Sequence, residues 1–335
     1  MQSLDDSLGG ADAGASGPNR EGNMASNLTK FLTTAAFGLG LMSSTAIAAD
    51  AESCKAVRFA DVGWTDIQVI TGIAANLFEA IGYQSEVKTL SVPVTYASLK
   101  NKDIDVFLGN WMPSMTADVT PYFDDKSVEQ LQPPNLTGAG YGVVVPQYVA
   151  DAGVKSIADL AANLDKFNGK FYGIESGNDG NRIIQTMIDD PKNNLAGFSL
   201  VESSEAGMLT EAEKAMKNNE WIMFLGWTPH PVMGEMKIHY LDGVDSYGFG
   251  PASVYTNVRA GYLTECPNAG KLVANLKFNL EMEGKMMDPV LKDGADPKDV
   301  AKDWIKANPD SIKAWLDGVT TLDGGDAMEA AKSLL

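Results

Sequence analysis

The sequence predicts an α/β protein with two lobes, each built on a mostly parallel sheet, around a ligand cleft. Its 335 residues are 44% hydrophobic and 21% charged, which is typical of a globular chain and enough for one large or two modest domains. Short apolar strands alternate with amphipathic helices, a pattern typical of parallel sheets covered on both faces. One segment of the chain also occurs twice, which indicates two related halves.

The amino terminus predicts export. Residues 1–23 are rich in Gly, Ala, Ser and Asp without apolar periodicity, which indicates a disordered leader or a mis-assigned start before Met24. Residues 24–48 combine Lys30, an apolar run and the small-residue motif 46–48, which is typical of a secretory signal peptide. A membrane anchor is the weaker alternative, because Thr and Gly dilute the run and it is shorter than the roughly 20 residues of a span.

Charge limits the classes of partner. The chain has 44 acidic and 26 basic residues, a formal net charge of -18. Such a chain repels phosphate backbones and anionic lipid, so we expect no nucleic acid and no membrane surface as partner, whereas a cationic ligand is compatible. No later stretch of sequence is long and apolar enough for direct membrane insertion.

The two cysteines, Cys54 and Cys266, form a pair far apart in the sequence. In an exported protein such a pair favours a disulfide over a metal or catalytic site. It would tie the mature amino terminus to a distant segment. Two buried free thiols are the alternative.

The internal repeat places two tryptophans at equivalent positions. Residues 99–109 and 216–226 both run from a polar helix end into a short apolar stretch that ends in Gly, and each copy is followed by a tryptophan and then a proline. Ligands of α/β sheets gather outside the carboxyl ends of the strands. We therefore expect Trp111 and Trp227 just past a strand end, at the cleft.

The first half is expected to begin with strand 56–60 and a turn that feeds a helix. Asp66 is a suitable N-cap for this helix, and Gly82 stands where a helix stops. The residues between them have the spacing of one buried face. These are Ile67, Ile70, Ala74, Leu77, Phe78 and Ile81.

The second half repeats this plan. Strand 170–174 is expected to lead into a helix that Asn178 or Asp179 caps, with a buried face of Ile183, Ile184, Met187 and Ile188. Gly and Pro cluster at 134–140 and 242–250, where we expect the chain to cross between the lobes. The expected boundaries are 52–139 plus 247–335 for lobe I and 140–246 for lobe II.

Four aromatic residues are expected at the cleft: Trp64, Trp111, Tyr141 and Trp227. A quaternary ammonium cannot donate hydrogen bonds, so proteins recognise it through aromatic faces, with Trp the best of them. The repeat supports Trp111 and Trp227, whereas Tyr141 could be a plain residue that opens the strand 142–145. The remaining tryptophans are expected to pack in the core: Trp221, Trp304 and Trp315.

Five short motifs make the chain recognisable: Gly63-Trp64-Thr65-Asp66, Gly109-Asn110-Trp111-Met112-Pro113, Gly140-Tyr141-Gly142, Ser176-Gly177-Asn178 and Gly226-Trp227-Thr228-Pro229. From about residue 52 to the end, the chain resembles the glycine betaine, carnitine and choline substrate-binding family of ABC importers. The resemblance implies a type II periplasmic-binding-protein fold that closes on its ligand. It also implies a periplasmic location and delivery of the ligand to an ABC transporter permease in the inner membrane.

The resemblance implies roles for single residues. In the family's choline-binding members, the positions that match Trp64, Trp111, Tyr141 and Trp227 form an aromatic box around the trimethylammonium group. The positions that match Asp66 and Asn178 hold the hydroxyl end, and Cys54 and Cys266 match a disulfide.

Choline is the expected ligand within this family. A carboxylate at Asp66 attracts the cation and accepts a hydrogen bond from an alcohol, whereas it repels the carboxylate of glycine betaine or carnitine. The alternatives are that Asp66 is only a helix cap, and that the ligand is glycine betaine, carnitine or another quaternary ammonium.

An enzyme is the main rival class, and a secreted hydrolase is its nearest form. The sequence has no Gly-x-Ser-x-Gly elbow, no His-Glu-x-x-His and no phosphate loop. Its two histidines are His230, expected in a loop near the cleft, and His239. We therefore expect a monomeric binding protein with no catalytic residues, no metal and no cofactor. A structural or adhesive protein would not need paired aromatic loops.

Overall fold

The computed structural model describes residues 50–335. The expected leader and signal peptide, residues 1–48, lie outside the described residues. Within residues 50–335 ten strands form one sheet, in the order β2-β1-β3-β10-β5-β8-β6-β7, with β4 paired to β10 and β9 to β5. In the same part of the chain, no helix is both long and apolar enough to cross a membrane.

The strands have the following bounds: β1 Ala56–Ala60, β2 Gln84–Lys88, β3 Val106–Met112, β4 Val128–Gln130, β5 Leu136–Pro146, β6 Lys170–Tyr172, β7 Ser199–Val201, β8 Phe224–Thr228, β9 Ile238–Tyr240 and β10 Gly250–Arg259. The α-helices are α1 Thr65–Ala80, α2 Val92–Lys100, α3 Thr116–Asp124, α4 Gln147–Asp151, α5 Asp179–Asp189, α6 Glu205–Lys217, α7 Pro231–Glu235, α8 Tyr262–Glu265, α9 Pro267–Asn275, α10 Leu280–Asp293, α11 Pro297–Ala307, α12 Ser311–Trp315 and α13 Ala327–Ala331.

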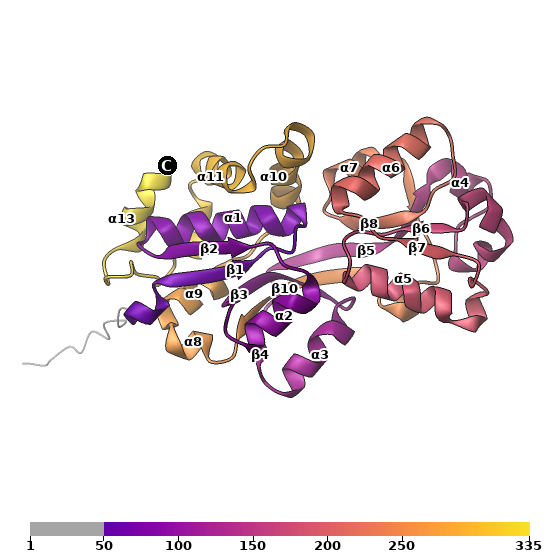
Figure 1. Ribbon diagram of the computed structural model, residues 1–335. Coiled ribbons are helices and arrows are strands. Elements are labelled where there is room, and N and C mark those ends of the chain that lie inside the picture. Colours follow the sequence, from indigo (N-terminus) through magenta and orange to yellow (C-terminus); the bar gives the residue numbers. More distant parts are fainter. Residues whose placement is uncertain (1–49) are drawn as a thin grey trace, which may run out of the picture. The chain divides into compact units, whose positions relative to one another are not determined.

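The sheet has two groups of parallel strands. In the first group β1 pairs in parallel with β2 and β3, and in the second β6 pairs in parallel with β7 and β8. The long strands β10 and β5 join the groups through antiparallel pairs (Figure 1). Helix α1 contacts β2 and β3, while α2 contacts β4 and β10. The predicted α/β class and the parallel character of each half are confirmed.

Strand β5 carries the chain from the first group to the second without a break. Leu136 to Tyr141 lie in its pairing with β10, and Gly140 to Val144 pair with β8. Gly138 and Gly140, in the segment where the crossing was expected, therefore lie within this strand rather than in a separate turn. Tyr141 consequently sits in the middle of a strand, and the prediction that it opens one is wrong.

Helix α1 packs in the interior along most of its length, as its apolar spacing predicts. It contacts α10 and α11, and Gly72 permits this approach, since a Cβ there would lie 2.9 Å from the Pro297 carbonyl oxygen. The predicted N-cap is wrong, because the helix begins at Thr65, with Trp64 in the cap position and Asp66 inside the first turn.

Helix α5 agrees with its prediction. The Asn178 side chain is its N-cap and accepts a hydrogen bond from the Asn181 amide, and its expected apolar face is buried. The preceding strand β6 ends at Tyr172, two residues before the expected end.

The two repeated tryptophans are the penultimate residues of their strands rather than the first residues beyond them. Trp111 in β3 pairs with Val254, and Trp227 in β8 pairs with Tyr141. Pairing with a long neighbouring strand extends each strand past the glycine that was expected to end it.

The three tryptophans outside the predicted cleft pack against the hydrophobic core, as expected. Trp315 is buried and lies 5.9 Å from Trp304 between ring centres. Trp221 is half-buried, and the Lys166 ammonium lies 4.2 Å from its ring centre.

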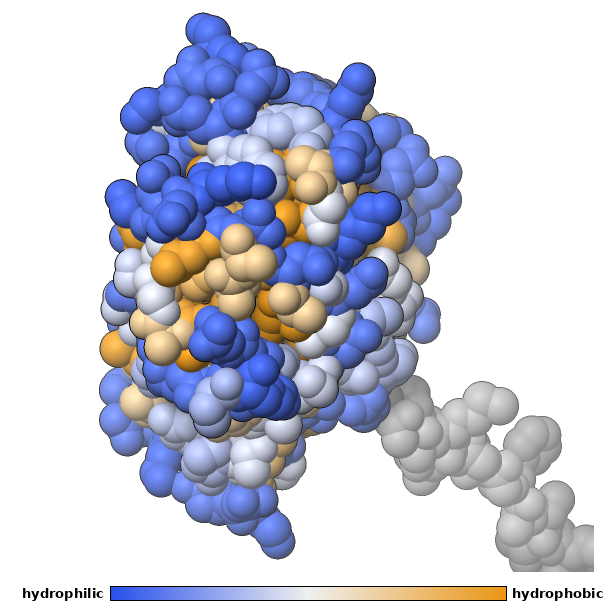
Figure 2. Space-filling model, turned by 90° about the vertical axis from the view of Figure 1, so that its right-hand side faces the viewer, coloured by the Kyte–Doolittle hydropathy of each residue, from blue (hydrophilic) through white to orange (hydrophobic). Residues whose placement is uncertain are grey.

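The side of the molecule that carries the second group of strands is mostly hydrophilic, with hydrophobic residues gathered near its middle (Figure 2). This surface agrees with the strongly acidic composition.

The predicted disulfide is present. The sulfurs of Cys54 and Cys266 are bonded, both residues are buried, and the bond closes a loop across a sequence separation of 212. It ties the start of the described chain to the residue that precedes α9. The alternative of two free thiols is excluded.

Reduction of this disulfide is expected to lower the free energy of unfolding by about 2 to 5 kcal/mol, because the reduced unfolded chain regains the freedom that a long closed loop removes. Urea unfolding with and without reductant measures the loss. The double variant Cys54→Ser/Cys266→Ser is the control, since its unfolding should not respond to reductant. Equal stability of the oxidised and reduced wild-type protein would contradict the prediction.

Candidate ligand-binding site

The six residues predicted to contact a ligand line one pocket. They are Trp64, Asp66, Trp111, Tyr141, Asn178 and Trp227, and Ile174 and Asp179 complete the lining. The pocket has about 260 Å³ of unfilled space, part of it open to solvent. None of the lining residues carries a positive charge.

Both groups of strands contribute to the pocket. Trp64 and Asp66 lie at the start of α1, and Trp111 lies at the end of β3. In the second group, Asn178 is the N-cap of α5, Asp179 is its first residue, and Trp227 is the penultimate residue of β8. The central strand β5 supplies Tyr141. The site therefore uses strand ends and helix starts, the places where α/β proteins bind ligands.

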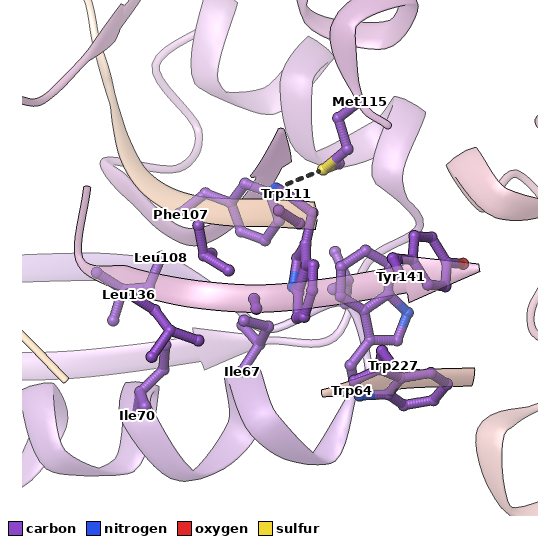
Figure 3. Packing of buried hydrophobic residues seen from close by; sticks show 14 of the residues in the cluster. Trp64, Ile67, Ile70, Phe107, Leu108, Trp111, Met115, Leu136, Tyr141 and Trp227 are labelled. Atoms are coloured by element: carbon purple, nitrogen blue, oxygen red, sulfur yellow. Dashed lines mark hydrogen bonds between the residues drawn. The ribbon is translucent and has the colours of Figure 1, made fainter. Parts of the chain in front are cut away.

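Four aromatic side chains form the wall of the pocket: Trp64, Trp111, Tyr141 and Trp227 (Figure 3). The ring centres of Trp111 and Tyr141 are 6.0 Å apart, and those of Tyr141 and Trp227 are 6.3 Å apart with nearly perpendicular planes. All four side chains are buried. Trp64 is held in place by a 2.8 Å hydrogen bond from its Nε1 to the Glu175 carboxylate. The Trp111 amide donates to the Met115 sulfur at 3.2 Å.

Asp66 is a buried carboxyl group, and no residue of the pocket lining supplies a positive charge to offset it. Neither of its carboxyl oxygens has a hydrogen-bond partner among the described residues, and the same is true of Trp111 Nε1. Burial, and next to it repulsion from Glu205, raises the pKa of Asp66 to about 8. The ionised form is therefore costly in the empty pocket, and a cation next to it would offset that cost.

The pocket lining also contains a carboxyl group, Asp179, that sequence reasoning did not assign to the site. Asn178 Oδ1 accepts hydrogen bonds from the Asn181 amide at 3.2 Å and from the Tyr141 hydroxyl at 3.1 Å. Its Nδ2 donates to Asp179 Oδ1 at 3.3 Å, which leaves Asp179 Oδ2 without a partner among residues 50–335. Burial raises the pKa of Asp179 to about 6. Asp179 begins α5 much as Asp66 begins α1, and this equivalence between the repeats is the signal that could have identified it.

Other buried acids surround the pocket. Burial raises the pKa of Glu175 to about 7. Burial, with a contribution from Asp66, also raises the pKa of Glu283 on α10. Within residues 50–335, no group of three or more His, Cys, Asp or Glu side chains is arranged to hold a metal ion. The arrangement suits an organic cation that is recognised by aromatic faces and needs few hydrogen bonds.

Known proteins resemble this chain along most of its described length. Residues 55–307 match the family described as the substrate-binding domain of ABC-type glycine betaine transport systems. The chain is 53% identical over 137 residues to an uncharacterized protein, ORF1, of Chromohalobacter salexigens, covering 41% of this chain and 88% of that one. It is 32% identical over 162 residues to the glycine betaine/carnitine transport binding protein GbuC of Listeria monocytogenes, covering 48% of this chain and 54% of that one.

Solved structures agree. An ABC-transporter choline-binding protein in complex with choline superposes with a TM-score of 0.82 at 53% identity, over 85% of this chain and 99% of that one. A choline-binding protein in an unliganded semi-closed conformation gives a TM-score of 0.76 at 54% identity, over 84% and 99%. Lactococcal OpuAC, complexed with glycine betaine, gives 0.70 at 26% identity, over 78% and 99%.

The raised pKa of Asp66 predicts a pH dependence of stability. The pKa of Asp66 is about 8 in the folded protein, whereas the ordinary value, expected in the unfolded chain, is 3.8. The folded state therefore holds this proton more tightly, and the protein loses stability as the pH rises from 3.8 to about 8. The Asp66→Asn variant lacks this titrating group. Between about pH 5 and pH 8 the stability of the wild type should therefore fall more steeply with pH than that of the variant, by up to about 1.4 kcal/mol per pH unit.

Urea unfolding of the ligand-free proteins at several pH values measures the two slopes. Asp303→Asn, at an exposed position of α11, is the matched control and should retain the wild-type slope. Parallel pH profiles for the wild type and Asp66→Asn would show that Asp66 ionises freely in the folded protein.

Proposed function

The chain belongs to the family of substrate-binding domains of ABC-type glycine betaine transport systems, and we propose that it captures choline in the aromatic pocket and delivers it to a membrane permease. The observation that carries the choice of ligand is the Asp66 carboxyl group, buried without a partner inside a wall of four aromatic rings. Glycine betaine, carnitine and other quaternary ammonium compounds are the alternatives within the family.

The aromatic wall supplies attraction for the cation. A trimethylammonium group presents only methyl groups, so it gains little from hydrogen-bonding residues and much from the negative faces of aromatic rings. Each desolvated contact of this kind contributes about 2 kcal/mol. Asp66 adds a Coulomb attraction that is strong because its carboxyl group is buried. The aromatic term acts equally on every ligand that carries the trimethylammonium group.

The other end of the ligand decides between choline and the betaines. The choline hydroxyl can donate to a carboxylate, and Asp66 and Asp179 offer oxygens without a partner among the described residues. The carboxylate of glycine betaine would instead meet these acids, with no positive side chain in the lining to balance it. The chain is also 53% identical to a choline-binding protein and 26% identical to the lactococcal protein complexed with glycine betaine.

Closure of two lobes around the ligand is part of the proposal. With lobe I at 52–139 plus 247–335 and lobe II at 140–246, Trp64, Asp66 and Trp111 belong to lobe I, while Tyr141, Asn178, Asp179 and Trp227 belong to lobe II. Neither lobe alone completes the box, so the bound ligand favours the closed population. The protein acts as a monomer, makes or breaks no bond and uses no cofactor.

Export to the periplasm completes the proposal. Residues 24–48 serve as the signal peptide. A disulfide between Cys54 and Cys266 supports this location, because disulfides persist in oxidising compartments.

Calorimetric titration of residues 49–335 with choline and with glycine betaine tests the ligand. Choline has about seven non-hydrogen atoms, for which a ceiling of about 1.5 kcal/mol per atom permits micromolar binding. We expect such binding at pH 8, with glycine betaine weaker by about tenfold or more, since burying its carboxylate near Asp66 and Asp179 is unfavourable. The affinity for choline should fall from pH 8 towards pH 6, because the proton on Asp66 competes with the cation. Preference for glycine betaine would refute choline and leave the family assignment intact.

Substitution of a box tryptophan tests the recognition of the cation. Trp111→Leu removes one aromatic face and should weaken choline binding by about tenfold or more, while Trp111→Phe keeps a smaller face and should weaken it less. Trp221→Leu is the matched control, because Trp221 packs between Phe167 and Lys166. Equal affinities for the leucine and phenylalanine variants would argue that Trp111 only fills space.

A further inference from the structure

Glu205 makes a buried bridge between two segments that lie far apart in the sequence. It is the first residue of α6, and its carboxylate accepts hydrogen bonds from the Thr65 amide and the Thr65 hydroxyl, both at 2.9 Å. The same carboxylate lies 3.1 Å from His230 Nε2. Glu205 and His230 are each only 5% exposed, so water does not screen these contacts.

The bridge replaces the missing cap of α1. Trp64 stands in the N-cap position and makes no side-chain capping bond, which would leave the first amides of the helix without an acceptor. Glu205 supplies that acceptor from another helix, and its negative charge suits the positive end of the α1 dipole. In the proposed division, Thr65 belongs to lobe I and Glu205 to lobe II, so the cap forms only when the lobes meet.

The bridge holds ligand-binding residues on both sides of the pocket. Thr65 lies between Trp64 and Asp66, so fixing its backbone fixes the positions from which both side chains enter the pocket. His230 lies in the loop between β8 and α7, as expected, and is the N-cap of α7; its ring lies edge-on to Trp227 with 4.8 Å between ring centres. One carboxylate therefore restrains Trp64 and Asp66 directly and Trp227 through His230.

We infer that Glu205 is a positioning residue of the ligand site, which caps α1 from the facing lobe and so couples closure of the pocket to the placement of Trp64, Asp66 and Trp227. This inference rests on the proposed function for the identity of the ligand and on the contacts of Glu205 with Thr65 and His230 for the bridge. Glu205 is not one of the residues that line the pocket, so it would not contact the bound ligand.

The same carboxylate acts on Asp66 through charge. Repulsion by Glu205 disfavours the ionised form of Asp66 in the empty closed pocket. A cation bound beside Asp66 offsets this repulsion. The free energy of forming the Glu205–Thr65 contact is therefore most favourable when the ligand is present.

Two substitutions separate capping from charge. Glu205→Ala removes every contact, whereas Glu205→Gln removes the charge and keeps an oxygen that can accept from the Thr65 amide. We expect Glu205→Ala to weaken choline binding about tenfold, the usual scale of a lost cap, and Glu205→Gln to restore most of the affinity. Glu213→Ala, at an exposed position of the same helix, is the control and should bind as the wild type does.

Hydrogen exchange at the Thr65 amide tests the bridge independently of the identity of the ligand. Exchange is compared between the wild type, Glu205→Ala and Glu205→Gln, both without ligand and with saturating choline. Faster exchange in Glu205→Ala in either state, with recovery in Glu205→Gln, supports the cap. Equal exchange in all three proteins in both states overturns the inference, as does equal weakening of choline binding by both substitutions.

The two proposals fail in different ways. Absence of choline binding by the wild type would refute choline as ligand, and the exchange rates at Thr65 would still decide whether Glu205 caps α1. The midpoint of thermal unfolding, measured for each variant, detects a general loss of folding. Such a loss would lower the midpoint and would speed hydrogen exchange in β6 and β8 as well as at Thr65.

Discussion

The structure depends on one electrostatic constraint, the burial of the Asp66 carboxyl group in an aromatic pocket that contains no positive charge. Burial of a carboxylate without a positive partner costs several kcal/mol. A few such sites would together cost roughly the whole stability of a small domain. The fold tolerates the cost because α1, which carries Asp66, is held along its length by α10 and α11. A cationic ligand relieves this cost, so the penalty in the empty protein becomes a part of the driving force for binding.

This constraint explains why the pocket needs residues from both groups of strands. Trp64 and Asp66 begin α1 in the first group, whereas Asn178, Asp179 and Trp227 come from the second. The groups are joined by the antiparallel strands β5 and β10, and Tyr141 of β5 lies where the two groups meet. A cation in the pocket therefore interacts with both groups at once. The bridge from Glu205 to Thr65 uses the same geometry to fix the helix start that presents Asp66.

The sequence predicted what depends on periodicity and repetition, and it failed where distant segments decide. The bounds of β1, the buried face of α1 and the capping of α5 by Asn178 follow from local patterns, and the repeat led to Trp111 and Trp227. Asp66 was expected as the cap of α1 because Asp is a preferred cap, but Glu205, 140 positions from Thr65 in the sequence, accepts the bond from the first amide of the helix. Gly140 belongs to the segment in which a crossing between the lobes was expected, and pairing on both sides keeps it in a strand. Asp179 had no local signal beyond its place at a helix start.

Affinity and specificity are physically separate in this pocket. In the proposed site the aromatic wall acts on the trimethylammonium group, which choline, carnitine and glycine betaine share, so it sets how tightly any of these ligands binds without choosing among them. The choice comes from the polar lining, where Asp66, Asn178 and Asp179 meet the rest of the ligand. An alcohol gives these residues a donor, whereas a carboxylate adds a second buried charge of the same sign as theirs. A relative that binds a betaine with the same aromatic box therefore needs a positive group in its lining, and none of the lining residues here carries one.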